Sequence, residues 1–294
     1  MGAIRNEFDI FDREREQGMF TVRYMCMRWD KPTGDCILMR APGGETMLVD
    51  SGVPHTASQV LDYLDRLGVE TLDIVLLTHP HLDHVGGMAR ILEEKYVQQL
   101  YTINISLEDL YTDAYRDAEE VLARKQIPRL VVEEGVKFRL GPDVEIEVLS
   151  PDKGMNPAEF ESKHDSVINH HSMVYRVTYK RNSFLFSTDI YEPREQMLIE
   201  KYGDRLKADM MHAPHHGSTS SSSVPYITAV NPQISVVSFR VNNRVTAEIL
   251  ARYRALGVTP YHVGIHGNIL LMSDGDRIQV VTENGVEQEE KIVE

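Results

Sequence analysis

Apolar and polar positions follow two different spacings along this chain, and each spacing predicts one kind of element. Short apolar or alternating runs, typical of strands, cover 20–27, 36–40, 46–50, 74–77, 100–105, 129–132, 137–140, 144–149, 172–179, 183–186, 208–212 and 234–239, and the segment 258–283 alternates like edge strands. Helical spacing covers 57–67, 107–125, 192–201, 226–229 and 246–256, and a further helix begins at Met88. The pattern predicts alternating strands and helices, with an irregular connection over 150–165.

One polar cluster follows a predicted strand directly. After the apolar run Ile74–Leu77 come His79, His81, Asp83 and His84, three histidines and one aspartate within six positions. Imidazole nitrogens and carboxylate oxygens are the ligands that zinc and its first-row neighbours prefer. A polar surface turn is the alternative, but a cluster held at the end of a buried strand delivers several ligands to one point. The motif therefore predicts a metal site at the rim of a sheet.

Four further groups of histidine or aspartate lie at the ends of other predicted strands. They are Asn169–Ser172, Asp189, His212–Ser218 and Tyr261–Gly267. Ten of the twelve histidines of the chain fall in these groups or in the first cluster, and only His55 and His164 lie elsewhere. Histidines that merely fill a core would be spread more evenly. The distribution indicates a site assembled from distant segments.

Composition is that of an ordinary soluble globular protein, with 42% hydrophobic and 26% charged residues. No apolar segment approaches the roughly 20 residues needed to cross a bilayer. The N-terminus has acidic residues where a secretory signal needs an apolar stretch, so we predict a cytoplasmic protein that does not bind membranes. Its two cysteines, Cys26 and Cys36, are expected to be reduced and packed, with no function of their own.

Taken in order, the polar groups resemble the metallo-β-lactamase superfamily. The resemblance rests on Asp50-Ser51-Gly52, the His79-x-His81-x-Asp83-His84 motif, a histidine before a strand, Asp189 and His215-His216-Gly217-Ser218, and extends from about Gly34 to Asp276. Within the superfamily the chain looks most like the hydrolase domain of ComEC-type DNA-uptake proteins, on the basis of Gly34–Leu38, Pro42–Gly44, Phe184–Asp189 and Pro214–Ser218. The resemblance implies an α/β fold, a four-layer αβ/βα sandwich with metals at one rim. We expect a single domain over 1–294, with N-terminal strands at 20–50, a core at 51–285 and a tail at 286–294.

The resemblance also implies two divalent metal ions, Zn²⁺ or Mn²⁺, bound by side chains at these strand ends. One ion would be bound by His79, His81 and a third histidine, either His170 or His171, of which His171 lies nearer the strand. The second would be bound by Asp83, His84 and His215. Asp189 would bridge the two ions, and Asp50 would orient ligands from behind.

Catalytic roles are expected for two residues of these motifs. Asp83 would orient a hydroxide that bridges the two metals. His216 would protonate the leaving group or bind a substrate oxygen, with a packing histidine as the alternative. His212 is expected to pack on the opposite strand face from His215. His262 and His266 fit a pocket wall and a structural turn equally well.

The formal net charge of −14 limits the substrates that fit such a site. Proteins that grip long nucleic acids by their phosphates carry clustered lysine and arginine, and here only Tyr179–Arg181 and Arg252–Arg254 are locally basic. The resemblance to the ComEC-type branch implies a phosphoesterase or phosphodiesterase that acts on nucleotides or short nucleic-acid ends, and the charge argues against long duplex DNA as its substrate. A carboxyl-ester, lactone or thioester hydrolase on the same metals is the alternative, and a degenerate, metal-stabilised module is a third.

Overall fold

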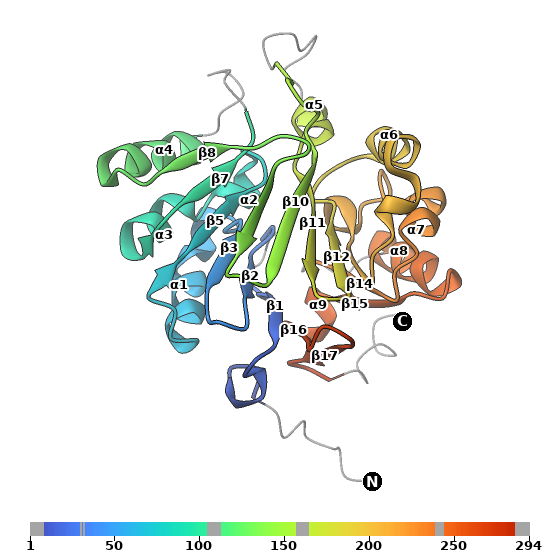
Figure 1. Cartoon of the computed structure of the whole chain (residues 1–294), viewed down its shortest axis with the longest axis horizontal. Helices are drawn as coiled ribbons and strands as arrows, with labels where there is room; N and C mark the ends of the chain where they lie inside the picture. Colours follow the sequence, from blue (N-terminus) through green and yellow to red (C-terminus); the bar gives the residue numbers. More distant parts are fainter. Residues whose placement is uncertain are drawn as a thin grey trace.

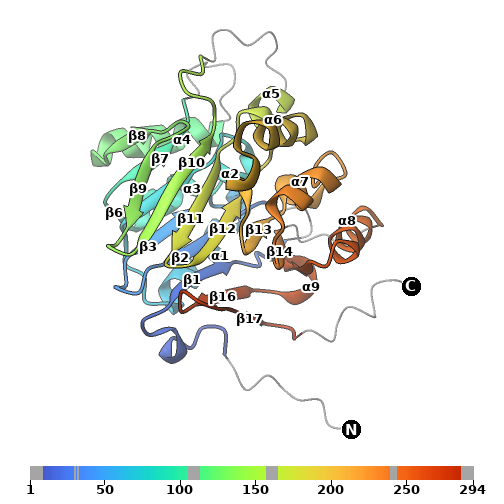
Figure 2. The same ribbon diagram turned by 45° about the vertical axis from the view of Figure 1, so that its right-hand side comes forward.

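Two β-sheets pack face to face, and each is covered on its outer side by helices, as Figures 1 and 2 show. The computed structural model describes residues 9–29, 31, 33–104, 113–156, 165–238 and 244–285. Helices α1, α3 and α4 lie on one outer face and α6, α7 and α8 on the other (Figure 1). This arrangement confirms the predicted four-layer αβ/βα sandwich.

The first sheet has the strand order β17-β16-β1-β2-β3-β5-β7-β8. Its strands are β1 (Phe20–Tyr24), β2 (Ile37–Arg40), β3 (Thr46–Val49), β5 (Ile74–Leu77), β7 (Leu100–Thr102), β8 (Arg129–Val131), β16 (Ile269–Ser273) and β17 (Ile278–Thr282). Strands β3, β5, β7 and β8 are parallel, and α1 (Ala57–Arg66), α3 (Met88–Glu94) and α4 (Asp113–Lys125) lie between them in the sequence. A small parallel pair joins β4 (Thr71–Leu72) to β6 (Tyr96–Val97).

The second sheet has the order β15-β14-β13-β12-β11-β10-β9. Its strands are β9 (Lys137–Leu140), β10 (Val144–Ser150), β11 (Val174–Tyr179), β12 (Asn182–Phe186), β13 (Met210–His212), β14 (Ile234–Val237) and β15 (Thr259–His262). Strands β12 to β15 are parallel, and they are connected through α6 (Glu192–Tyr202), α7 (Val224–Val230) and α8 (Arg244–Ala255).

Strand periodicity explains how a single strand contributes to two apolar layers, the core between the sheets and the core beneath the helices. In β5, Ile74 and Leu76 face the core between the two sheets, whereas Val75 and Leu77 face the helices. Strands covered on both faces are apolar throughout because neither set of side chains meets water. Helix α1 then buries Val60 in the helix-side core. Each such side chain contributes about 1.5–3 kcal/mol when fully buried, so burial stabilises the framework that carries the strand ends.

Some short elements differ from the sequence-based expectations. The short helices α2 (Leu82–Val85) and α5 (Asp165–His170) were not predicted, because one turn of helix is too short to show a period. The region 258–283 does supply edge strands, β17 in the first sheet and β15 in the second, whereas β16 lies one place inside the first sheet between β17 and β1. The start of the helix predicted over 107–125 lies outside the described residues. No described helix is both long and apolar enough to cross a membrane.

The polar groups of the sequence meet at one edge of the two sheets. In a parallel arrangement the carboxyl ends of neighbouring strands share an edge, and ligands bind there. The residues that follow such ends are Asp50 after β3, Thr78–His84 after β5, Asp189 after β12, His215 and His216 after β13, and Ser238 after β14. Asp35 precedes β2 and Ser172 precedes β11, and both strands run antiparallel to a neighbour, which brings these residues to the same edge.

Candidate active site

A buried aspartate organises the histidine motif from behind. Asp50 is fully buried, and its Oδ1 accepts a hydrogen bond from the Thr78 backbone N–H at 2.9 Å, while its Oδ2 accepts one from the Thr78 hydroxyl at 2.7 Å. The same Oδ2 lies 2.7 Å from Nδ1 of His84. Because Nδ1 is held by the carboxylate, the Nε2 atom of His84 faces away from Asp50. Asp50 therefore occupies the orienting position expected for it.

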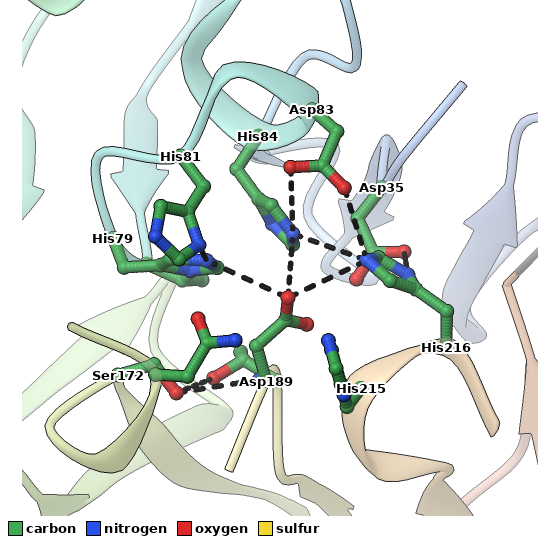
Figure 3. A network of polar contacts seen from close by, with 12 residues as sticks. Asp35, His79, His81, Asp83, His84, Ser172, Asp189, His215 and His216 are labelled. Carbon is green, nitrogen blue, oxygen red and sulfur yellow. Dashed lines mark hydrogen bonds and ion pairs between the residues drawn. The ribbon is translucent and has the colours of Figure 1, made fainter. Parts of the chain in front are cut away.

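Asp189 lies at the centre of the site, as Figure 3 shows. Its Oδ2 is 3.6 Å from Nε2 of His79, 3.4 Å from Nε2 of His84 and 3.5 Å from Nε2 of His216. Its other oxygen, Oδ1, is buried and has no hydrogen-bond partner in the described part of the chain. A buried carboxylate that is encircled by imidazole nitrogens and has one unused oxygen is a natural place for a cation.

Two groups of donor atoms share Asp189. His79, His81 and Asp189 form one group, and Asp35, His84, Asp189 and His216 form the other, with all atoms of each group within 4.8 Å of one another. Metal–ligand bonds of about 2.0–2.2 Å at tetrahedral angles place neighbouring ligand atoms roughly 3.4 Å apart. The spacing around Asp189 Oδ2 matches that value. The donor set therefore fits two divalent ions, with Asp189 common to both.

The shifted pKa values in the site also indicate a place that favours cations. Burial opposes the charged forms of His84 and His216, yet the carboxylates of Asp189 and of Asp50 or Asp35 raise the pKa of both imidazoles well above the usual value. Burial also opposes ionisation of Asp189, but His216 and His84 hold the pKa of Asp189 well below its usual range. The buried carboxylates thus require neighbouring positive charge, which protons or metal ions can supply.

The other predicted site residues lie at different distances from this centre. Asp83 belongs to it, with Oδ2 at 3.4 Å from Nε2 of His216 and Oδ1 at 4.0 Å from Nε2 of His84, and 36% of its side chain is exposed. Among the described residues, neither His170 nor His171 joins a group of potential metal ligands. Both histidines are only partly buried. His170 is the last residue of α5, His171 follows it, and their rings lie beside each other.

The two histidines after β13 occupy places opposite to those expected. His216 is buried and belongs to the central group, whereas His215 is only partly buried and belongs to neither group. The His215 ring lies beside Asp189 in Figure 3. Its Nδ1 is 3.1 Å from the Ser220 hydroxyl, and its ring packs edge-on against Tyr191. His215 is thus held at the margin of the site.

The backbone at this edge is unusual. Asp50, Thr188, His215 and His216 all have positive φ angles, between 35° and 54°, a conformation that costs a non-glycine residue of order 1 kcal/mol or more. Hydrogen bonds hold the turns in place, since the N–H of His215 donates to the Thr188 carbonyl at 2.6 Å and the Thr188 hydroxyl donates to the Met173 carbonyl, also at 2.6 Å. Four of the eight non-glycine residues with positive φ in the described part of the chain lie around this one centre, and such clustering favours a functional site.

Two residues of the site were not predicted as such. In the sequence, Asp35 stands out only as part of the Gly34–Leu38 segment that resembles ComEC-type proteins. In the structure, its carboxylate lies 3.2 Å from Nδ1 of His216. His212 was expected to pack on a strand, and it does, but its Nε2 also lies 3.2 Å from Asp35. Asp35 precedes a strand of the first sheet and His212 ends a strand of the second, so their contact is invisible in the sequence.

Comparisons with known proteins agree with this geometry. Residues 29–239 match the family described as the metallo-beta-lactamase superfamily. Competence protein ComA of Neisseria gonorrhoeae is 27% identical over 243 residues, which are 81% of this chain and 31% of that protein. The uncharacterized protein YcaI of Escherichia coli is 26% identical over 227 residues, which are 71% of this chain and 26% of that protein. The chain therefore spans only about a quarter to a third of the length of these relatives.

Solved structures share the fold at low sequence identity. The metallo-beta-lactamase fold protein YhfI from Bacillus subtilis has a TM-score of 0.55 at 13% identity, covering 89% of this chain and 100% of that one. CmlA, a diiron beta-hydroxylase from Streptomyces venezuelae, has a TM-score of 0.50 at 14% identity, covering 90% of this chain and 54% of that one. Both likenesses concern the fold alone.

Proposed function

The chain belongs to the metallo-β-lactamase superfamily of metal-dependent hydrolases, and we propose that it is a phosphodiesterase acting on nucleotides or short nucleic-acid ends. The observation that carries the proposal is the pairing of a buried two-ion donor set with a partly exposed histidine, His215, on its margin. Similarity to a competence protein supports a nucleic-acid-derived substrate. The net charge of −14 supports a small substrate over a long duplex.

The roles within the site follow from burial. His79 and His81 would hold one ion, His84 and His216 the other, and Asp189 both. Bound divalent ions supply Lewis acidity and make a strong nucleophile available at neutral pH. Asp83, partly exposed beside this set, would orient the attacking water by accepting a hydrogen bond from it.

His215 would take the substrate-facing role that the sequence suggested for His216. Burial lowers the pKa of His215, against the opposing charge of Asp189, so its ring is mainly neutral at pH 7. A neutral imidazole with Nδ1 beside the Ser220 hydroxyl presents Nε2 as a hydrogen-bonding group toward a substrate oxygen. His216, with Nε2 close to two carboxylates, has no ring nitrogen to spare for a substrate.

A substrate panel tests the proposal. The protein, purified with Zn²⁺ or Mn²⁺, is assayed with bis-p-nitrophenyl phosphate, a lactone and a thioester, and its ion content is measured in parallel. We expect phosphodiester turnover that falls at least about 100-fold in Asp83→Ala, whereas Asp117→Ala, at an exposed position of α4, leaves turnover unchanged. Turnover of only the lactone or the thioester would favour the alternative hydrolase, and full ion content with no turnover would favour a degenerate module.

A further inference from the structure

A chain of buried polar side chains runs from His216 across the interface between the two sheets. The Tyr24 hydroxyl lies 3.2 Å from Nδ1 of His212, Nε2 of His212 lies 3.2 Å from Oδ2 of Asp35, and Oδ1 of Asp35 lies 3.2 Å from Nδ1 of His216. Tyr24, Asp35 and His212 are each no more than 2% exposed. Tyr24 ends β1 and Asp35 precedes β2 of the first sheet, whereas His212 ends β13 of the second sheet and His216 follows it.

Each member of this chain is fixed by its neighbours. The His212 ring stacks on Tyr24 with centroids 5.6 Å apart and an interplanar angle of 10°, and it also lies against Phe186. The Asp35 backbone N–H donates to the Asp83 carbonyl at 3.2 Å. Oδ1 of Asp35 has no hydrogen-bond partner among the described residues, and its contact with Nδ1 of His216 at 3.2 Å is electrostatic. A buried carboxylate is costly to leave uncompensated, and two flanking imidazoles compensate it here.

Asp35 has the same position relative to His216, which follows a strand of the second sheet, as Asp50 has relative to His84, which follows a strand of the first. Asp50 lies at Nδ1 of His84 and Asp35 lies at Nδ1 of His216. In both cases the Nε2 atom faces the centre, and the two Nε2 atoms are 3.3 Å apart. A carboxylate hydrogen-bonded to Nδ1, as Asp50 is to His84, fixes the ring orientation and the tautomer of a metal-binding histidine. The Asp35 carboxylate attracts the same atom of His216 across 3.2 Å. Asp35 is also close enough to the centre to be a direct ligand, but both of its oxygens face imidazoles.

We propose that Asp35 is a positioning residue that holds His216 for the second metal ion, and that Tyr24 and His212 hold Asp35 in turn. The inference rests on the proposed two-ion function, and it adds that the second ion site is complete only when the two sheets are docked. The hydroxyl of Ser238, 3.1 Å from Nδ1 of His216, is the competing candidate for the same role.

Metal titration of the full chain tests this assignment without relying on turnover. The apo proteins are titrated with Zn²⁺ by calorimetry, and their final ion content is measured. We expect Asp35→Asn to weaken binding of one ion about 10- to 100-fold, with the other ion bound as in the wild type. Asp50→Asn provides the comparison on His84. Asp209 directly precedes β13, the strand that His212 ends, and its carboxylate accepts a hydrogen bond from the Ser183 backbone N–H. Asp209→Asn is therefore the control and should bind both ions normally.

Further variants separate positioning from direct ligation and from misfolding. Tyr24→Phe keeps the ring stack and removes only the hydroxyl, so a two- to five-fold loss for the same ion supports the chain of contacts. In Co²⁺-loaded protein, Asp35→Asn should move the ring N–H proton resonance of one coordinated histidine while the number of coordinated histidines stays the same. Normal binding of both ions by Asp35→Asn would overturn the proposal, as would a loss confined to Ser238→Ala. Wild-type protein that binds two ions but cleaves no phosphodiester would instead refute only the proposed function.

Discussion

Individual histidines in this protein differ in role because they differ in burial and in what faces each ring nitrogen. His84 and His216 have a carboxylate at Nδ1 and face the common centre through Nε2. His215 has a serine hydroxyl at Nδ1 and is partly exposed. His262 and His266 are buried together, where the His262 backbone N–H donates to Nδ1 of His266 at 2.9 Å, which favours a structural turn.

Adjacent histidines should respond differently to the same substitution. We expect His216→Ala to lower the ion content from two toward one per chain, because its Nε2 lies within the central group. His215→Ala should retain both ions and lose about 100-fold in phosphodiester turnover. Ion content by mass spectrometry and initial rates on the same samples test this difference. Loss of an ion in His215→Ala with both ions kept in His216→Ala would instead support His215 as the metal ligand and His216 as the catalytic residue, as the family resemblance implies.

His262 gives a prediction on the pH dependence of stability. Burial, with a smaller effect of His266, lowers the pKa of His262 to about 3, and none of the described residues forms a hydrogen bond with either ring nitrogen. Below pH 6.5 the unfolded chain binds a proton that the folded chain does not, so this histidine reduces stability progressively as pH falls from 6.5 to 3. At pH 5 the reduction is about 2 kcal/mol.

The check is urea unfolding at pH 7 and pH 5, with a chelator present. Replacing His262 by Phe should make the loss of stability between these pH values smaller by about 2 kcal/mol than in the wild type. His55→Phe, at an exposed position, is the matched control and should keep the wild-type difference. Equal differences in all three proteins would show that His262 does not contribute.

Backbone contacts between loops and helices, as well as the ends of strands, position the residues of the site. The loop between β1 and β2 passes directly over α2, where the N–H of Asp35 donates to the carbonyl of Asp83. Gly34 makes this approach possible, because its φ is +72° and a Cβ there would overlap the Asp83 carbonyl oxygen. One glycine therefore links the loop that carries Asp35 to the helix that carries His84.

Gly34→Ala should disturb both the fold and the site. Alanine at this φ is strained, and the overlap with Asp83 adds to that cost, so we expect a loss of more than about 1 kcal/mol in unfolding free energy together with weaker binding of one ion. Gly18→Ala tests the cost of the backbone conformation alone, since Gly18 has φ +73° and no atom of the described residues lies within 4 Å of the position of a Cβ. Equal effects of the two substitutions in urea unfolding and ion content would contradict the argument.

At the scale of the whole molecule, the site connects the two halves of the sandwich. His79, His81 and His84 come from the first sheet, and Asp189 and His216 come from the second. Ions bound between them would stabilise the docked arrangement relative to the unfolded chain. Such stabilisation reaches about 4 kcal/mol when the free ion concentration is a thousand times Kd.

Chelation should therefore lower the melting temperature, and by more at higher pH. The raised pKa values of His84 and His216 stabilise the metal-free fold fully below pH 6.5, and this contribution is lost as pH rises through the raised values. Protons also compete with metal ions for the same nitrogens. Thermal melts with and without EDTA should show a larger difference at pH 8 than at pH 6, whereas a constant or reversed difference would count against metal binding at these histidines.

The sequence alone determined most of the strands and helices of the fold and most of the residues at the candidate site. Apolar runs such as Ile74–Leu77 are local signals for strands buried on both faces, and the polar clusters directly after them identified the edge where ligands converge. The family resemblance added the four-layer sandwich, which the structure confirms. The position of Asp83 in the sequence was sufficient to place it at the site, because it lies within the same short segment as His79 and His84.

Only the tertiary structure decided what depends on side-chain direction and on contacts between the sheets. His215 and His216 are neighbours in sequence, and the positive φ angles of both residues determine which ring enters the centre, a choice that spacing does not encode. Asp35 and His212 meet because β2 and β13 belong to different sheets that pack face to face. Such contacts arise from the packing of the two halves, and a periodic pattern reports only which face of an element is buried.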